Sequence, residues 1–259
     1  MHRSKKKFIY TGIIAGALLC ALVVGVYAMR STSEPFTKQL GAVVESTATN
    51  TPSIPSEDSA LDTAMYSTTD PTSIWVIVNK TKPIAAEYAP NDLTLPAVQL
   101  QTGKTSQEMS VRRDAATELE KMFAAAKEQG VQLKLASGYR SYDLQEYYYN
   151  SLVRSLGAEE ANKVSAKPGT SEHQTGLAVD IASYSNDVCH LETCFGTMPE
   201  GQWLANNAHT YGFIIRYPQS KTAVTGYNYE PWHVRYVGKE LAAQLQKTGQ
   251  TLEEFFSAQ

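Results

Sequence analysis

The longest apolar run of the chain extends almost unbroken from Phe8 to Met29 and follows a basic cluster at residues 1–7. A run of about 22 residues is long enough to cross a bilayer as a helix, and the basic flank predicts that the N-terminus stays in the cytoplasm. We therefore expect residues 1–29 to form a single-pass membrane anchor. A signal peptide cleaved after Val26-Tyr27-Ala28 is the alternative. Both alternatives place the rest of the chain outside the cytoplasm.

Residues 30–72 show no sustained hydrophobic period and are rich in Ser, Thr, Pro and Ala. Such a composition is typical of an extended or disordered linker, because it offers too few apolar side chains to build a core. The sequence therefore predicts a spacer between the membrane segment and one folded domain at residues 73–259.

Strand and helix patterns are mixed along the predicted domain. Short apolar or alternating runs predict strands at residues 74–78, 131–135, 176–182, 213–217 and 232–236. Helical spacing predicts helices at residues 110–129, 141–156, 201–211 and 239–247, and a capping-box pattern at 251–254 predicts one more short helix. The order lacks the regular alternation of a doubly wound parallel sheet. We expect an α+β domain, with helices packed on a small, largely antiparallel sheet.

The first predicted helix has clear end signals. Ser110 is its expected N-cap, and Gly130 supplies its stop. Between them, apolar residues recur at helical spacing: Ala115, Leu119, Met122, Phe123 and Ala126. This stripe predicts a helix face buried in the core rather than a binding surface.

The charge of the chain is divided unevenly along its length. The formal net charge of −3 becomes about −7 when the four basic residues of the N-terminal tip are set aside. A mildly acidic exported domain argues against a nucleic-acid partner, which requires a basic face.

Cys189 and Cys194 flank a four-residue segment of the predicted exported domain. Two nearby cysteines outside the cytoplasm most simply form a disulfide, and so short a loop adds on the order of 2 kcal/mol. A zinc site built from Cys189, His190 and Cys194 is the rival interpretation. It lacks a nearby fourth ligand, which a structural zinc site requires.

The residues that could carry chemistry lie in separate segments. His173 and Asp180 are seven residues apart with a glycine between them, and Glu230 and His233 follow some fifty residues later. Two histidines and one carboxylate are a plausible ligand set for a zinc site that keeps a fourth position open for water. Glu230 would then be the general base, and Arg140 the cation that faces an oxyanion.

The same residues also allow an interpretation without a metal. A histidine near an aspartate is usually a hydrogen-bonded pair, and Glu-Pro-Trp-His by itself is a weak motif. Spacing alone therefore leaves zinc catalysis and a metal-free structural pair open.

Four motifs in order give the chain a more specific resemblance. Between roughly Trp75 and Val237, it resembles the VanY-like D-alanyl-D-alanine carboxypeptidases, zinc peptidases of bacterial cell walls. The resemblance rests on Ser137-Gly138-Tyr139-Arg140-Ser141, on Ser171-x-His173-x-x-Gly176-x-Ala178-x-Asp180, on Gly212-Phe213-Ile214-Ile215-Arg216-Tyr217-Pro218, and on Gly226-Tyr227-x-Tyr229-Glu230-Pro231-Trp232-His233.

The resemblance assigns a role to each candidate residue. It implies zinc held by three ligands, namely His173, Asp180 and His233. It implies that Glu230 is the general base and that Arg140 stabilises the tetrahedral intermediate. It also implies that Ser171 and Gln145 engage the terminal D-alanine and its carboxylate.

We accordingly expect a membrane-anchored, extracytoplasmic zinc peptidase whose substrate is the peptidoglycan stem peptide and whose product is the terminal D-alanine. An L,D-carboxypeptidase, a D,D-dipeptidase or an endopeptidase of the same fold remains open. A cell-wall-binding module without turnover is an alternative of a different class. The presence of Glu230 beside a complete ligand set argues against that alternative, because a pure binder needs no base.

Overall fold

The structure, a computed structural model, describes residues 61–258. The predicted membrane segment and most of the predicted linker lie outside the described residues. Among residues 61–258, no helix is long and apolar enough to cross a membrane.

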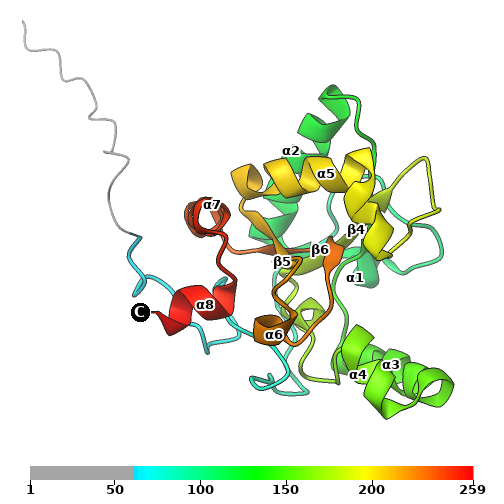
Figure 1. Ribbon diagram of the computed structural model, residues 1–259, viewed down its shortest axis with the longest axis vertical. Helices are drawn as coiled ribbons and strands as arrows, with labels where there is room; N and C mark the ends of the chain where they lie inside the picture. The colour runs from blue at the N-terminus through cyan, green and yellow to red at the C-terminus, as the bar shows by residue number, and fades with distance from the viewer. Residues whose placement is uncertain (1–60, 259) are drawn as a thin grey trace, which may run out of the picture. The chain divides into compact units, whose positions relative to one another are not determined.

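A four-stranded antiparallel sheet forms the centre of the domain (Figure 1). Its strands lie in the order β3 (Leu133–Ser137), β4 (Ala178–Ser183), β6 (Glu230–Tyr236) and β5 (Phe213–Tyr217). A second, two-stranded sheet pairs β1 (Leu93–Thr94) with β2 (Val111–Arg112). Every ladder between these strands is antiparallel, which confirms the predicted α+β class.

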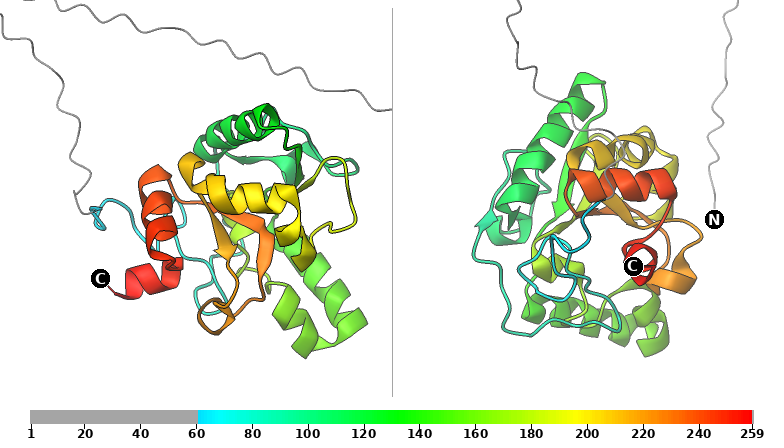
Figure 2. Two further views of the ribbon diagram at one scale, coloured as in Figure 1. Left: turned by 45° about the horizontal axis from the view of Figure 1, so that its top comes forward. Right: turned by 90° about the vertical axis from the view of Figure 1, so that its left-hand side faces the viewer.

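Eight α-helices and three 3₁₀ helices complete the part of the chain that is described. The α-helices are α1 (Ser106–Met109), α2 (Arg113–Glu128), α3 (Tyr142–Leu156), α4 (Ala158–Val164), α5 (Pro199–Asn207), α6 (Thr222–Thr225), α7 (Lys239–Thr248) and α8 (Leu252–Ser257). The 3₁₀ helices are η1 (Glu172–Thr175), η2 (Thr193–Thr197) and η3 (Ala208–Tyr211). Helices α3 and α4 form a hairpin that projects away from the sheet, as Figures 1 and 2 show.

Strand alternation gives the sheet one apolar and one polar face. On β4 and β6, Val179, Ile181 and Val234 point into the main core, where the apolar stripe of α2 and part of α5 pack against them. Asp180 and His233, which alternate with these residues, therefore point to the opposite face. Side chains that are one position apart along a strand are thus divided between the core and the candidate site.

A smaller apolar cluster lies beside the sheet and includes Trp75, residues of α7, and Leu252 and Phe255 of α8. Trp75 is 2% exposed, and its indole Nε1 donates to the carbonyl of Val237. The segment before the sheet and the C-terminal helix are thereby tied to the same end of β6.

The predicted strand at residues 74–78 does not form, although its side chains are largely buried. Its backbone groups bond outside any ladder. The carbonyls of Ile74 and Val76 accept from Arg235 Nη2 at 3.0 and 2.8 Å, and Ile77 N donates to Thr68 O at 2.9 Å. Buried backbone polar groups need partners. Here a buried arginine supplies some of them in place of a neighbouring strand.

The predicted cap at Ser110 is also wrong, since α2 begins at Arg113. Ser110 instead ends the short helix α1, and its hydroxyl donates back to the carbonyl of Ser106 at 2.8 Å. Residues 61–72, which the sequence places in the linker, contact the domain. The Tyr66 ring packs edge-on against Trp75, and Thr72 O accepts from Arg112 Nη1.

Candidate active site

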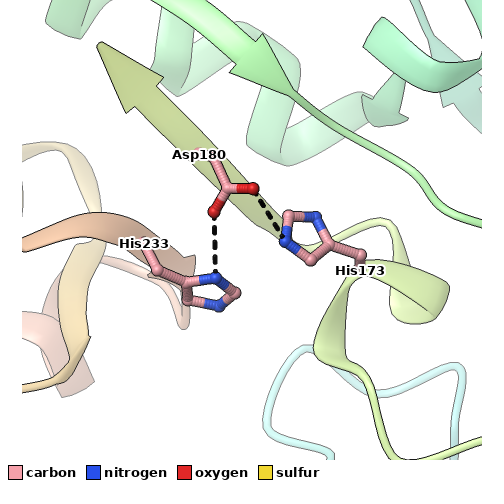
Figure 3. Close-up of side chains that lie close together, drawn as sticks. All are labelled: His173, Asp180 and His233. Carbon is pink, nitrogen blue, oxygen red and sulfur yellow. Dashed lines mark hydrogen bonds and ion pairs between the residues drawn. The ribbon is translucent and has the colours of Figure 1, made fainter. Parts of the chain in front are cut away.

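His173, Asp180 and His233 converge on the polar face of the sheet (Figure 3). Asp180 Oδ2 lies 3.3 Å from His173 Nε2, and Asp180 Oδ1 lies 3.1 Å from His233 Nδ1. The three residues are 4–5% exposed. A buried carboxylate thus lies between two imidazole rings, with one ring nitrogen of each aimed at it.

Strand pairing brings two of these residues together. In the antiparallel ladder of β4 and β6, Asp180 is directly opposite His233. His173 arrives from η1, which ends at Gly176 with φ of 68°. A Cβ at Gly176 would lie 3.0 to 3.2 Å from neighbouring side chains, and an L-residue rarely adopts this backbone conformation. Glycine at this position therefore permits the tight turn from His173 into β4.

A backbone contact fixes the orientation of the His173 ring. His173 Nδ1 lies 2.7 Å from the carbonyl of Gly138, so Nδ1 carries the proton and Nε2 is left to face Asp180. Gly138 itself sits against α1, where an added Cβ would lie 2.6 Å from Ser110 O. The Ser-Gly-Tyr-Arg motif therefore has a structural role at its glycine as well as a chemical one at its arginine.

The triad fits a zinc ion. Ligand bonds of about 2.0–2.2 Å in a tetrahedral site place ligand atoms roughly 3.3 Å apart, and the two contacts to Asp180 measure 3.1 and 3.3 Å. The one ligand atom from each residue lies within 4.8 Å of the others. Neutral imidazole and carboxylate are also a donor set that zinc accepts. His173 Nε2, Asp180 and His233 Nδ1 would hold it.

Electrostatics of the triad reflect burial and mutual attraction. Burial by itself raises the pKa of Asp180, but the two histidines hold that pKa well below its usual range. Burial lowers the pKa of His173. For His233, burial acts in the same direction, but the carboxylates of Asp180 and Glu172 more than offset it and raise the pKa to about 9. A metal at this site must therefore displace a proton from His233.

Glu230 stands at the start of β6, with Oε2 3.9 Å from His233 Nδ1. A bulge between this strand and β5 pairs Ile215 with Val234 and Tyr217 with Glu230, so two extra residues of β6 lie between the pairs. Pro231 falls within the bulge, where its missing N–H costs no ladder bond. Burial raises the pKa of Glu230 to about 7. A carboxylate that titrates near neutrality beside a metal site is suited to accept a proton.

Arg140 is held from several sides. Its Nη1 donates to Gln145 Oε1 at 2.9 Å and its Nη2 to Ser137 Oγ at 3.2 Å, while Nη2 also lies 3.6 Å from Asp180 Oδ2. The guanidinium additionally packs over the Tyr148 ring at 5.4 Å. These contacts keep the cation at the edge of the triad.

Gln145, expected at the substrate, is found elsewhere. It is 1% exposed and does not line the cavity. Besides accepting from Arg140, its amide donates to Ser165 Oγ at 3.2 Å and to the carbonyl of Ala166 at 2.7 Å. The amide of Gln145 therefore bonds within the chain, and its oxygen helps to hold Arg140 in this structure.

A cavity of about 580 Å³ opens over the triad. Ser171, 5% exposed, lines it together with the triad, Arg140 and Glu230. Lys104, Tyr148, Tyr217 and Tyr227 also line the cavity, and the sequence assigned none of them a role. Tyr217 and Tyr227 belong to quoted motifs, which was a usable signal, whereas Lys104 precedes α1 in a loop that carries no motif.

Cys189 and Cys194 form the predicted disulfide, with an S–S distance of 2.09 Å. Two residues of the loop they close, His190 and Leu191, line the cavity. Leu191 has φ of 52°, a left-handed conformation that is uncommon outside glycine. The disulfide loop is therefore one wall of the candidate site. Among residues 61–258, the triad is the only group of His, Cys, Asp or Glu side chains placed to hold a metal.

Fold and site together define a buried centre that can hold a metal with a carboxylate base beside it. The family model described as "VanY: D-alanyl-D-alanine carboxypeptidase" matches residues 108–239, which include all three triad residues, Glu230 and Arg140. The chain belongs to this family.

Relatives and solved structures agree with the assignment. The chain is 46% identical over 187 residues to the putative carboxypeptidase YodJ of Bacillus subtilis, covering 72% of this chain and 68% of that protein. It is 35% identical over 198 residues to a D-alanyl-D-alanine carboxypeptidase of Enterococcus faecalis, with coverages of 71% and 66%. The chain thus spans about two thirds of the length of these relatives.

Two solved structures bear on chemistry. The LdcB LD-carboxypeptidase matches with a TM-score of 0.68 and 45% identity, over 72% of this chain and 87% of that one. VanY from a VanB-type vancomycin resistance cassette, solved with Zn(II), matches with a TM-score of 0.58 and 34% identity, over 70% and 97%. A homologue that holds zinc supports the metal inferred from the triad.

Proposed function

We propose that this protein is a zinc-dependent D-alanyl-D-alanine carboxypeptidase that removes the terminal D-alanine from peptidoglycan stem peptides. The observation that carries the proposal is the position of Glu230. Its carboxylate lies 3.9 Å from His233 Nδ1 at the border of the triad, lines the same cavity, and has a pKa raised to about 7 by burial. A site that only bound a peptide would not need such a base.

The residues divide the work of hydrolysis among themselves. Zinc bound at the triad supplies Lewis-acid polarisation of the scissile carbonyl and acidifies water. Glu230 accepts the proton of the attacking water and returns it to the departing amine of D-alanine. Arg140, fixed by Gln145 and Ser137, donates to the oxygen on which negative charge develops. Ser171 lies at the cavity wall, and in this proposal it contacts the terminal residue of the substrate.

An L,D-carboxypeptidase acting on a tetrapeptide stem is the second candidate. It is favoured by the likeness to LdcB, which has the higher identity and TM-score of the two structures compared above. Both activities release one D-alanine by the same chemistry, and they differ in the configuration of the residue before the scissile bond. A D,D-dipeptidase and an endopeptidase require different closure of the cavity around the substrate.

The chosen test is mass spectrometry of products from defined tri-, tetra- and pentapeptide stems incubated with the zinc-loaded chain. Loss of one D-alanine from the pentapeptide alone supports the D,D activity, and loss from the tetrapeptide supports the L,D activity. Glu230→Gln should retain zinc and lose activity by roughly 10²- to 10⁴-fold, the usual worth of a general base. Full turnover by Glu230→Gln would refute the assigned role, and no release from any stem would refute the proposed function.

We further propose that the catalytic domain acts outside the cytoplasm, tethered by the apolar segment at residues 8–29 or released if that segment is cleaved. Peptidoglycan lies on that side of the membrane. Fractionation of cells that produce the full chain, followed by protease treatment of intact protoplasts, tests this placement. Protection of the domain from the added protease would contradict it.

A further inference from the structure

A buried cluster of charged side chains lies beneath the triad and has no role in the proposed chemistry. Glu172, at the start of η1, is 1% exposed. Its Oε1 accepts from Arg216 Nε and from Arg235 Nη1, both at 2.7 Å. Arg216 also donates to the carboxylate of Glu253 on α8. Two arginines with side chains at 0% exposure therefore fix one oxygen of one carboxylate.

The second oxygen of Glu172 faces a metal ligand. Glu172 Oε2 lies 3.6 Å from His233 Nε2, slightly beyond hydrogen-bond length. Within residues 61–258, both of these buried atoms lack a hydrogen-bond partner. Unpartnered buried polar atoms are costly, so two that face one another indicate a contact that is completed when His233 is held by a metal through Nδ1.

We propose that Glu172 is a positioning residue for the metal ligand His233. Glu172 Oε2 accepts the Nε2 proton of His233, which leaves Nδ1 bare and directed at the metal, while Arg216 and Arg235 hold Glu172 in place. His173 is oriented in the equivalent manner by the carbonyl of Gly138. The inference rests on the zinc site described above and assigns a function to a residue that has no role in the proposed chemistry.

The isosteric variant Glu172→Gln gives a sharp prediction. Because two arginine donors surround Oε1, the amide oxygen of the new side chain must face them, and its NH₂ group must face His233 Nε2. A donor at that position favours the His233 tautomer with the proton on Nδ1, the nitrogen that binds metal. We expect zinc to bind roughly 10- to 100-fold more weakly, the usual cost of losing a partner of a metal-bound histidine.

Glu253→Gln is the matched control. It is the same change in the same charge network and removes a carboxylate from Arg216, yet Glu253 bonds to Arg216 and Asn79 and has no contact with His233 among the described residues. We expect it to lower the midpoint of thermal unfolding and to leave the dissociation constant for zinc about unchanged. Equal weakening of zinc binding in the two variants would overturn the inference, because the effect would then follow from lost stability alone.

The experiment measures the dissociation constant of zinc by competition with a chromophoric chelator on the metal-free full chain and both variants. Long-range ¹H–¹⁵N NMR of the zinc-loaded wild type supplies a second measurement that needs no variant to fold. We expect an exchange-protected proton on His233 Nε2 and metal on Nδ1. Metal on Nε2, or a rapidly exchanging Nε2 proton, would overturn the inference.

The two proposals fail in different ways. If the wild type binds zinc and Glu172→Gln binds it equally tightly, only the role of Glu172 is wrong. If the wild type does not bind zinc, the proposed function is wrong as well.

Discussion

The variant Gln145→Met separates two roles for a buried glutamine. The family resemblance implies a contact between Gln145 and the substrate, whereas the structure shows a residue 1% exposed whose amide bonds to Arg140, Ser165 and Ala166. Methionine preserves the volume of the side chain and removes the amide. If Gln145 acts through Arg140, the change should lower kcat and leave KM about the same, because an interaction made in the transition state is lost.

The expected size of the effect follows from the bond that is removed. A hydrogen bond to a charged group contributes about 1.5–3 kcal/mol, and each 1.36 kcal/mol is tenfold in rate, so full loss corresponds to roughly 10- to 150-fold. The Arg140 side chain is 18% exposed, and water can replace part of the lost bond. It also keeps its contact with Ser137 Oγ at 3.2 Å. We therefore expect a decrease in kcat at the lower end, roughly 10- to 30-fold.

The assay is steady-state release of D-alanine from a pentapeptide stem by the zinc-loaded chain. Ser183→Ala is a suitable control, since it removes a buried hydrogen bond, from Ser183 Oγ to Glu200 Oε1 at 2.7 Å, that lies away from the cavity. It should cost comparable stability without lowering kcat. An increase in KM with unchanged kcat for Gln145→Met would show that Gln145 contacts the substrate and that the positioning argument is wrong.

Three further predictions concern pH, the disulfide loop and the N-terminal segment. Glu230 must be ionised to accept a proton, so kcat/KM should fall as the pH drops through the pKa of this carboxyl. Burial raises that pKa to about 7 in the metal-free chain, and a nearby dication lowers it. An acidic limb centred above pH 7 in the zinc-loaded enzyme would contradict the assigned role. Leu191→Gly should relieve a left-handed backbone conformation that costs roughly 1–2 kcal/mol, so unfolding assays should show no loss of stability. The change also removes a side chain from the cavity wall, so the KM should rise. An unchanged KM would contradict the second expectation. Trp75→Ala should lower the free energy of unfolding in urea by about 3–5 kcal/mol, because the ring is 2% exposed and its indole donates to Val237 O. A loss below about 1 kcal/mol would show that this segment is not part of the core.

Local patterns in the sequence were sufficient to predict most elements of the described domain. The helix over residues 141–156 is observed at Tyr142–Leu156, with Ser141 as its cap, and the capping box at Thr251 forms as predicted. Two errors concern the partners of polar groups. The apolar run at residues 74–78 was assigned correctly to the folded domain, but Arg235 supplies backbone partners there in place of a neighbouring strand. At Ser110, the hydroxyl donates back to the carbonyl of Ser106 at the end of α1, a helix that no pattern predicted. Periodicity indicates which side chains are buried and does not identify the partner of a backbone group.

Sequence motifs identified the main residues of the candidate site but not the residue that packs behind them. The metal triad, Glu230 and Arg140 were all within quoted motifs, and the register of β4 and β6 places Asp180 opposite His233. Glu172 lay inside the most informative motif, directly before His173, and yet no role for it could be derived from the sequence. Its role depends on Arg216 and Arg235, which meet it from two different strands at 2.7 Å.

Glu172 is next to His173 in sequence, but adjacent side chains on a helical turn do not face each other. The structure directs Glu172 to the other histidine of the triad, while His173 Nδ1 faces the carbonyl of Gly138. The cluster also connects His233 to parts of the chain beyond the family match, because Arg216 bonds to α8 and Arg235 to the carbonyls at residues 74 and 76. If zinc affinity depends on the Glu172 contact, the segment at residues 74–76 contributes to the metal site by holding Arg235.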